Sequence, residues 1–173
     1  MKKIIFSLVC IALALGSCGD SAKDVNTVII SQLKGIESKL EVISHDISED
    51  KYEEAKVAID SLPAQITAAK AAISVLSNSR AGAYKTSALD YLSYIEKGAG
   101  AAFTESMSLF QAAKVREQDD VAKGKQSPYL VNSGPDFDAA RKIVKDFMKE
   151  LKKYHEVVIE KNEKFLKANN LKG

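Results

Sequence analysis

Apolar residues recur every three or four positions along four long stretches of the chain, which is the spacing of one face of an α-helix. The clearest stretch lies between Asp20 and Ser48, where the spacings from Ile29 onward are 4, 3, 4, 3 and 4. Its apolar positions are Val25, Ile29, Leu33, Ile36, Leu40, Ile43 and Ile47. This heptad-like repeat predicts an amphipathic helix over about 20–48 rather than a strand.

A second helix is predicted over about 51–77, where Asp50 and Glu53 resemble a capping box at its start. Pro63 interrupts this stretch, and a proline removes one helical hydrogen bond and clashes with the preceding turn. Because the apolar spacing keeps its phase across the proline, we expect one kinked helix; two shorter helices are the alternative. The apolar positions are Tyr52, Ala55, Ile59, Leu62, Ile66, Ala69, Ile73 and Leu76.

The third stretch, about 83–119, has a broader apolar face and contains Gly98 and Gly100 near its centre. Two glycines cost a helix roughly 2 kcal/mol relative to alanine. We expect a continuous helix in which a neighbouring backbone crosses closely over Gly98 to Ala102; a local helix break is the alternative. The face predicted to be buried comprises Tyr84, Ala88, Tyr91, Ile95, Ala99, Ala102, Met107 and Phe110.

Residues 120–135 contain two glycines and two prolines and are predicted to form the longest connection. A fourth helix follows over about 135–170, with Pro135 near its first position and Asp136 and Asp138 in its first turn. Its stripe consists of Phe137, Ala140, Val144, Phe147, Leu151, Tyr154, Val158, Lys161, Phe165 and Ala168.

Four amphipathic helices with two short connections and one longer one predict an all-α fold, an antiparallel four-helix bundle. The first and last helical segments differ in charge. Residues 18–60 carry 10 acidic and 5 basic residues, whereas residues 136–173 carry 10 basic and 7 acidic residues. Opposite charge favours side-by-side packing of the first and last helices.

The first residues of the chain have the features of a secretory signal peptide. Lys2 and Lys3 precede an apolar run from Ile4 to Leu15, and the small residues Gly16 and Ser17 follow it. The run is shorter than the roughly 20 residues that a transmembrane helix needs. We therefore expect residues 1–17 to be removed and residues 18–173 to form a single domain.

The segment Leu15-Gly16-Ser17-Cys18 resembles the lipobox of bacterial lipoproteins. That resemblance implies that diacylglycerol is attached to the Cys18 thiol and that cleavage occurs just before this residue. Two or three acyl chains anchor a protein durably, since each buried methylene contributes about 0.8 kcal/mol. Gly19 occupies the next position, where an aspartate would favour inner-membrane retention, so an outer-membrane location is expected.

The composition of the chain argues against nucleic-acid binding and against cysteine chemistry. Loss of Lys2 and Lys3 lowers Lys plus Arg from 25 to 23, equal to the 23 Asp plus Glu, so no basic footprint for nucleic acid is predicted. The second cysteine, Cys10, lies in the segment predicted to be removed. With Cys18 lipidated, we expect no disulfide, no cysteine-ligated metal and no thiol catalysis in the mature domain.

The two histidines are the natural candidates for metal or acid–base chemistry. His45 lies at i, i+4 spacing with Glu41 and Glu49, and His155 lies among lysines, but both fall outside the apolar stripes. A di-iron bundle needs a Glu three residues before a His, and those positions hold Val42 and Lys152. We predict solvated helix faces at both histidines, and no catalytic residue, metal or cofactor.

The segments DKYEEAKVAIDSL and FDAARKIVKDFMKELKKYHEVVIEKNEKFLKANNL, together with LGSC, resemble small helical surface-lipoprotein families of unknown function from Bacteroidetes and spirochaetes. These families supply no catalytic residues to transfer. We expect a non-enzymatic interaction or structural module, held at the membrane through Cys18, with a protein partner in the envelope. The alternative is a small-ligand binder that uses a gap near Gly98 to Ala102 or the 120–135 loop. The sequence leaves open the partner, the membrane face and the oligomeric state.

Overall fold

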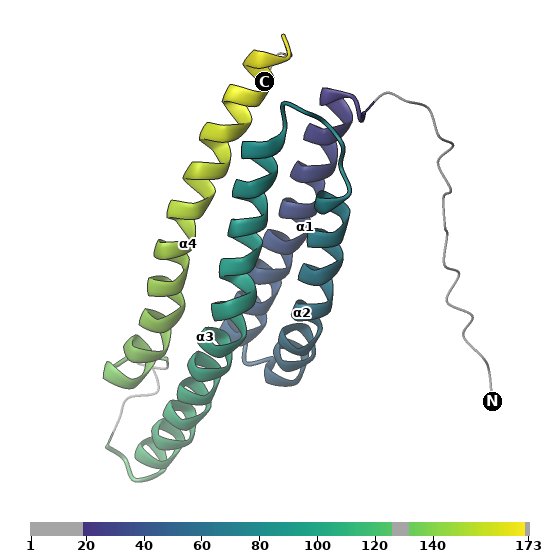
Figure 1. The fold of residues 1–173 in the computed structure, drawn as a ribbon. Helices are drawn as coiled ribbons and strands as arrows, with labels where there is room; N and C mark the ends of the chain where they lie inside the picture. The colour runs from purple at the N-terminus through teal and green to yellow at the C-terminus, as the bar shows by residue number, and fades with distance from the viewer. Residues whose placement is uncertain (1–18, 126–131, 172–173) are drawn as a thin grey trace, which may run out of the picture.

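The computed structural model describes residues 19–125 and 132–171, and within them the chain forms a four-helix bundle (Figure 1). The helices are α1 (Ala22–Ser48), α2 (Tyr52–Ser74), α3 (Gly82–Ala122) and α4 (Pro135–Ala168). The predicted fold class is confirmed. The predicted signal peptide (residues 1–17) and Cys18 lie outside the described residues.

The predicted stripe of α1 is buried at every position from Val25 to Ile47. The stripes of α2 and α4 are mostly buried, but Tyr154 and Ala168 on α4 are exposed, and Tyr52 and Leu76 at the ends of α2 are half-buried. On α3 the buried face is wider than predicted, because this helix packs against all three others. It adds Ser87, Leu92, Phe103, Ser106, Ala113 and Glu117 to the predicted positions.

Helix ends follow local chemistry that the stripes do not reveal. The Ser21 side chain caps α1 by accepting a hydrogen bond from the Asp24 N–H at 3.1 Å. Residue Asp50 does not cap α2 as predicted. It ends α1 in a left-handed conformation (φ 59°), and Lys51 N–H donates back to the carbonyl of Asp46 at 2.8 Å.

Two predicted helix ends were also wrong. Helix α2 stops at Ser74, and the connection that follows it is tied to Asp20 through Ser77 and Asn78. Helix α3 continues to Ala122, and Gly124, two residues beyond its end, has φ 68°. Glycine adopts this left-handed conformation without the penalty that a side chain brings.

Both central interruptions leave the helices continuous. Helix α2 passes through Pro63, so the prediction of one helix is confirmed. Helix α3 passes through Gly98 and Gly100 without a break. The predicted close crossing of a neighbouring backbone is wrong, because among the described residues no backbone of another helix lies within 4 Å of a Cβ at either glycine. A Cβ at Gly98 would lie 3.1 Å from Cε2 of Phe147, whereas a Cβ at Gly100 would have nothing within 4 Å. A side-chain ring of α4 therefore fills the space beside Gly98.

The packing of the helices is uneven. Helix α4 packs mainly on α3, and α1 packs on α2 and more lightly on α3. The first and last helices are not among the closely packed pairs, so the predicted side-by-side packing of α1 and α4 is wrong. Figure 1 shows that the second half of α3 extends past the α1–α2 turn.

Candidate functional site

The seam between α1 and α4 forms a groove made of three adjoining hollows, with volumes of about 260, 350 and 270 Å³. The hollows are contiguous because the first two share Leu40, Glu41 and Met148, and the last two share Ser44, Ser48 and Val144. On α1 the groove runs from Glu37 to Ser48, about 17 Å at 1.5 Å per residue. We call this feature the α1–α4 groove.

Helix α3 forms the floor of the groove and holds α4 in place through aromatic contacts. The ring centroids of Phe103 and Phe147 are 6.3 Å apart, and those of Phe110 and Phe137 are 5.9 Å apart. Edge-to-face pairs of this kind add about 0.5–1.5 kcal/mol to the free energy gained by burial. These bulky pairs attach α4 to α3, and α1 faces α2 with aliphatic side chains instead. Because α4 packs on α3 and α1 packs on α2, a groove remains between α1 and α4.

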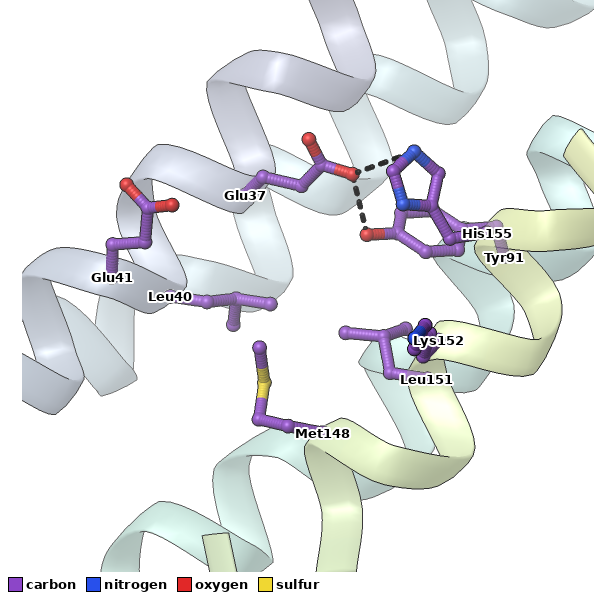
Figure 2. A pocket seen from close by; sticks show the side chains of 8 residues that line it. All are labelled: Glu37, Leu40, Glu41, Tyr91, Met148, Leu151, Lys152 and His155. Atoms are coloured by element: carbon purple, nitrogen blue, oxygen red, sulfur yellow. Dashed lines mark hydrogen bonds and ion pairs between the residues drawn. The ribbon is translucent and has the colours of Figure 1, made fainter. Parts of the chain in front are cut away.

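A polar cluster closes one end of the groove (Figure 2). The hydroxyl of Tyr91 donates a hydrogen bond to Oε1 of Glu37 at 2.7 Å, and Nε2 of His155 lies 3.7 Å from the same oxygen. The rings of Tyr91 and His155 pack with their centroids 5.7 Å apart. Burial raises the pKa of Tyr91 well above its usual range, and the hydrogen bond to Glu37 and its charge raise it further.

The two sides of the groove carry opposite charge. Helix α1 contributes Glu37 and Glu41, whereas α4 contributes basic side chains at Arg141, Lys145 and Lys152. Glu41 and Lys152 form no ion pair with each other among residues 19–125 and 132–171. Within the described part of the chain, Glu41 and Lys145 form no ion pair.

The histidines occupy different environments. His45 is exposed at the rim of the middle hollow. His155 contacts Glu37 and Tyr91 while 45% of its side chain is exposed, so the predicted solvated face is only partly solvated at this residue. The structure brings no group of three or more metal-ligand side chains together among residues 19–125 and 132–171.

The three tyrosines of α3 lie in two kinds of environment. Tyr84 and Tyr91 are buried in the core. Tyr94 is half-buried and stacks on the rings of Tyr154 and Phe147, with centroid distances of 4.6 and 5.4 Å. The ring of Phe147 also covers Gly98, so the described residues leave no gap beside this glycine for a small ligand.

Sequence reasoning did not find the groove. Its exposed apolar residue, Met148, falls between the stripe positions of α4 and is 40% exposed. The opposite charge of the first and last helices is the available signal, because charged rims of opposite sign border the groove. Cys18, the predicted lipidation site, lies outside the described residues. Residues 126–131 of the predicted 120–135 loop also lie outside them.

None of the helices in the described ranges is both long and apolar enough to cross a membrane. Comparisons of the chain with protein-family models, with curated proteins and with solved structures gave no match. No functional residue is therefore assigned by similarity.

Proposed function

We propose that the protein is a lipid-anchored module of the bacterial cell envelope that binds a protein partner through the α1–α4 groove and performs no catalysis. The groove carries the proposal: it is an elongated depression with an apolar floor and rims of opposite charge. Grooves of this kind suit the apolar face and charged flanks of another helix. The lipobox LGSC supplies the anchor, at the outer membrane.

The residues immediately after the proposed lipidation site are tied to the α2–α3 connection. The carbonyl oxygen of Ser77 occupies the place where a Cβ on Gly19 would lie, so residue 19 has no room for a side chain. Oδ2 of Asp20 accepts a hydrogen bond from the Ser77 N–H at 2.6 Å, and Nδ2 of Asn78 donates to the carbonyl of Asp20 at 3.0 Å. A lipid on Cys18 would thus be one residue from a fixed point of the bundle.

This attachment sets an orientation. The start of α1, the α2–α3 turn and the end of α4 lie at the same end of the bundle (Figure 1). That end would face the bilayer, and the α1–α4 groove, which runs along the helices, would open sideways. A partner would then approach the groove in a direction parallel to the membrane surface.

Two variants of the full chain test the proposal. With Cys18→Ala we expect loss of fractionation with membranes and of radiolabelled palmitate incorporation. A photo-crosslinking amino acid at Met148 is expected to capture a defined envelope protein in intact cells. The same group at Val57, which is 70% exposed on α2, is the matched control. Membrane association of the Cys18→Ala chain, or equal capture at both positions, would contradict the proposal.

The second candidate function is binding of a small ligand. One observation favours it: the hollow of about 260 Å³ combines apolar walls, formed by Leu40, Met148 and Leu151, with the polar cluster at its end (Figure 2). Native mass spectrometry of the protein from its own host tests this alternative. A stoichiometric bound molecule that Leu151→Trp excludes would favour the ligand-binding function, and a ligand-free protein would count against it.

A further inference from the structure

The charges of the α1–α4 groove make it complementary to itself. The acidic rim on α1 and the basic rim on α4 lie on opposite sides of one apolar floor. A two-fold axis parallel to the groove lays α1 of one copy against α4 of the other, so each acidic rim meets a basic rim. We propose that the partner in the groove is a second copy of this chain, in parallel orientation.

The levels of the charged residues agree with this arrangement. Glu37 on α1 lies beside His155 on α4, and the two helices run in opposite directions. Glu41, one turn further along α1, therefore lies at about the height of Lys152, about one turn back along α4. Rotation about an axis parallel to the groove preserves height, which brings Glu41 of one copy opposite Lys152 of the second copy. Two such ion pairs form, one on each side of the axis.

These side chains are free to pair between copies. Glu41 forms no ion pair within the described residues, and Nζ of Lys152 is 4.0 Å from Glu156, with 75% of the lysine side chain exposed. Exposed pairs at that distance contribute little to stability. Met148 lies between the rims and is 40% exposed. Its flexible apolar side chain would be covered by α1 of the second copy, and methionine is enriched in protein interfaces.

Other relative orientations are less favourable. A two-fold axis that crosses the groove at right angles lays α1 on α1, so that acidic rims meet and basic rims meet, and like charges repel. The parallel arrangement also keeps the Gly19 ends of both copies on one side, as two lipid anchors in a single membrane require. That last point rests on the proposed function, whereas the charge complementarity does not.

Disulfide trapping between two full-length chains tests the interface in membranes. One chain carries Glu41→Cys and the other, with a different tag, carries Lys152→Cys. Oxidation is expected to give a mixed disulfide dimer of the two chains. The control pair, Glu54→Cys with Lys56→Cys, lies on exposed positions of α2 and is expected to stay monomeric. A dimer linked through two Glu41→Cys chains would instead place α1 on α1 and contradict the parallel arrangement.

Sedimentation of the full chain in detergent gives an independent readout. The single variants Glu41→Lys and Lys152→Glu each place like charges together twice in the dimer, and we expect the dissociation constant to rise by roughly tenfold or more. The double variant restores opposite charges and is expected to recover the wild-type value. Unchanged circular dichroism and thermal melting of the single variants identify the effect as loss of association.

The outcomes separate this inference from the proposed function. A monomer in detergent with no mixed disulfide overturns the dimer, even if Cys18 is lipidated. Trapping of a different protein at Lys152→Cys without a homodimer also overturns it and identifies another occupant. A mixed disulfide with charge rescue supports the dimer, and it does so even if Cys18 is found unmodified.

Discussion

Nε2 of His155 on α4 lies 3.7 Å from Oε1 of Glu37 on α1, and this is the one polar contact between these two helices within the described residues. The same carboxylate oxygen accepts the hydrogen bond of the Tyr91 hydroxyl at 2.7 Å. The first and last helices therefore meet through a polar cluster at one end of a groove. Elsewhere along the groove, α3 joins them from below.

Tyr91→Phe removes the hydroxyl that donates to Glu37 and keeps the buried ring. We expect the free energy of unfolding to fall by about 1.5–3 kcal/mol, since hydrogen bonds to charged groups contribute in this range. Urea unfolding at pH 7 measures the change. Tyr154→Phe is the control, because the Tyr154 side chain is partly exposed and its change should stay within about 0.5 kcal/mol. Equal effects of the two substitutions would show that the contact with Glu37 contributes nothing.

Gly98→Ala and Gly100→Ala form a matched pair on one helix. Alanine favours a helix by about 1 kcal/mol over glycine. At Gly100 nothing lies within 4 Å of the added Cβ, so we expect stabilisation of about 0.5–1 kcal/mol. At Gly98 the Phe147 ring lies 3.1 Å from the new atom and must shift, so the gain should be cancelled or reversed. Denaturant midpoints of the two variants measure the difference. Equal stabilisation at both positions would contradict the close contact between residue 98 and the Phe147 ring.

Alkaline pH should destabilise the protein through Tyr84. Burial raises the pKa of Tyr84 to about 12, above its ordinary value near 10. Its contribution to stability is therefore complete below pH 10 and is lost as the pH rises from 10 to 12. The difference corresponds to on the order of 2–3 kcal/mol. Urea midpoints between pH 8 and 11 should fall less steeply in Tyr84→Phe than in the wild type, and parallel curves would contradict the assignment.

The α1–α2 turn should be sensitive to acid through Asp50. Burial acts to raise the pKa of Asp50, but hydrogen bonds from Lys114 and Tyr52, with the charge of Lys114, outweigh it and lower the pKa below 3.8. The stabilisation is present above the ordinary value and is lost as the pH falls through the lowered one. Thermal melting below pH 4 should therefore drop less in Lys114→Met than in the wild type. Lys123→Met, in an exposed pair with Asp119, should behave like the wild type.

The sequence predicted the helices because burial of an apolar face controls where they form. The stripe of α1 needs only one side to be apolar, and each of its positions from Val25 to Ile47 is buried. Helix α3 contacts three neighbours, so residues such as Phe103 and Leu92 are buried outside a single stripe. A pattern based on one face does not describe a helix that is surrounded.

The candidate site could not be predicted in the same way. The groove forms because α4 packs closely on α3 and not on α1. The rings of Phe147 and Phe137 on α4 pack against aromatic rings of α3, which favours this pairing of helices. That choice is a property of three-dimensional packing and not of spacing along the chain. Counting charges shows that α1 and α4 are complementary. It does not show that, within the described residues of one copy, Glu41 forms no ion pair and Lys152 pairs only with Glu156 on its own helix, at 4.0 Å.

The mass of the mature polypeptide extracted from membranes tests the account of a lipid-anchored module most directly. We predict a chain that begins at Cys18 and carries a diacylglycerol group on this residue, with fatty-acid fragments released from the N-terminal peptide. A chain that keeps residues 1–17, or one that begins at an unmodified residue and leaves the membrane on washing, would contradict the account.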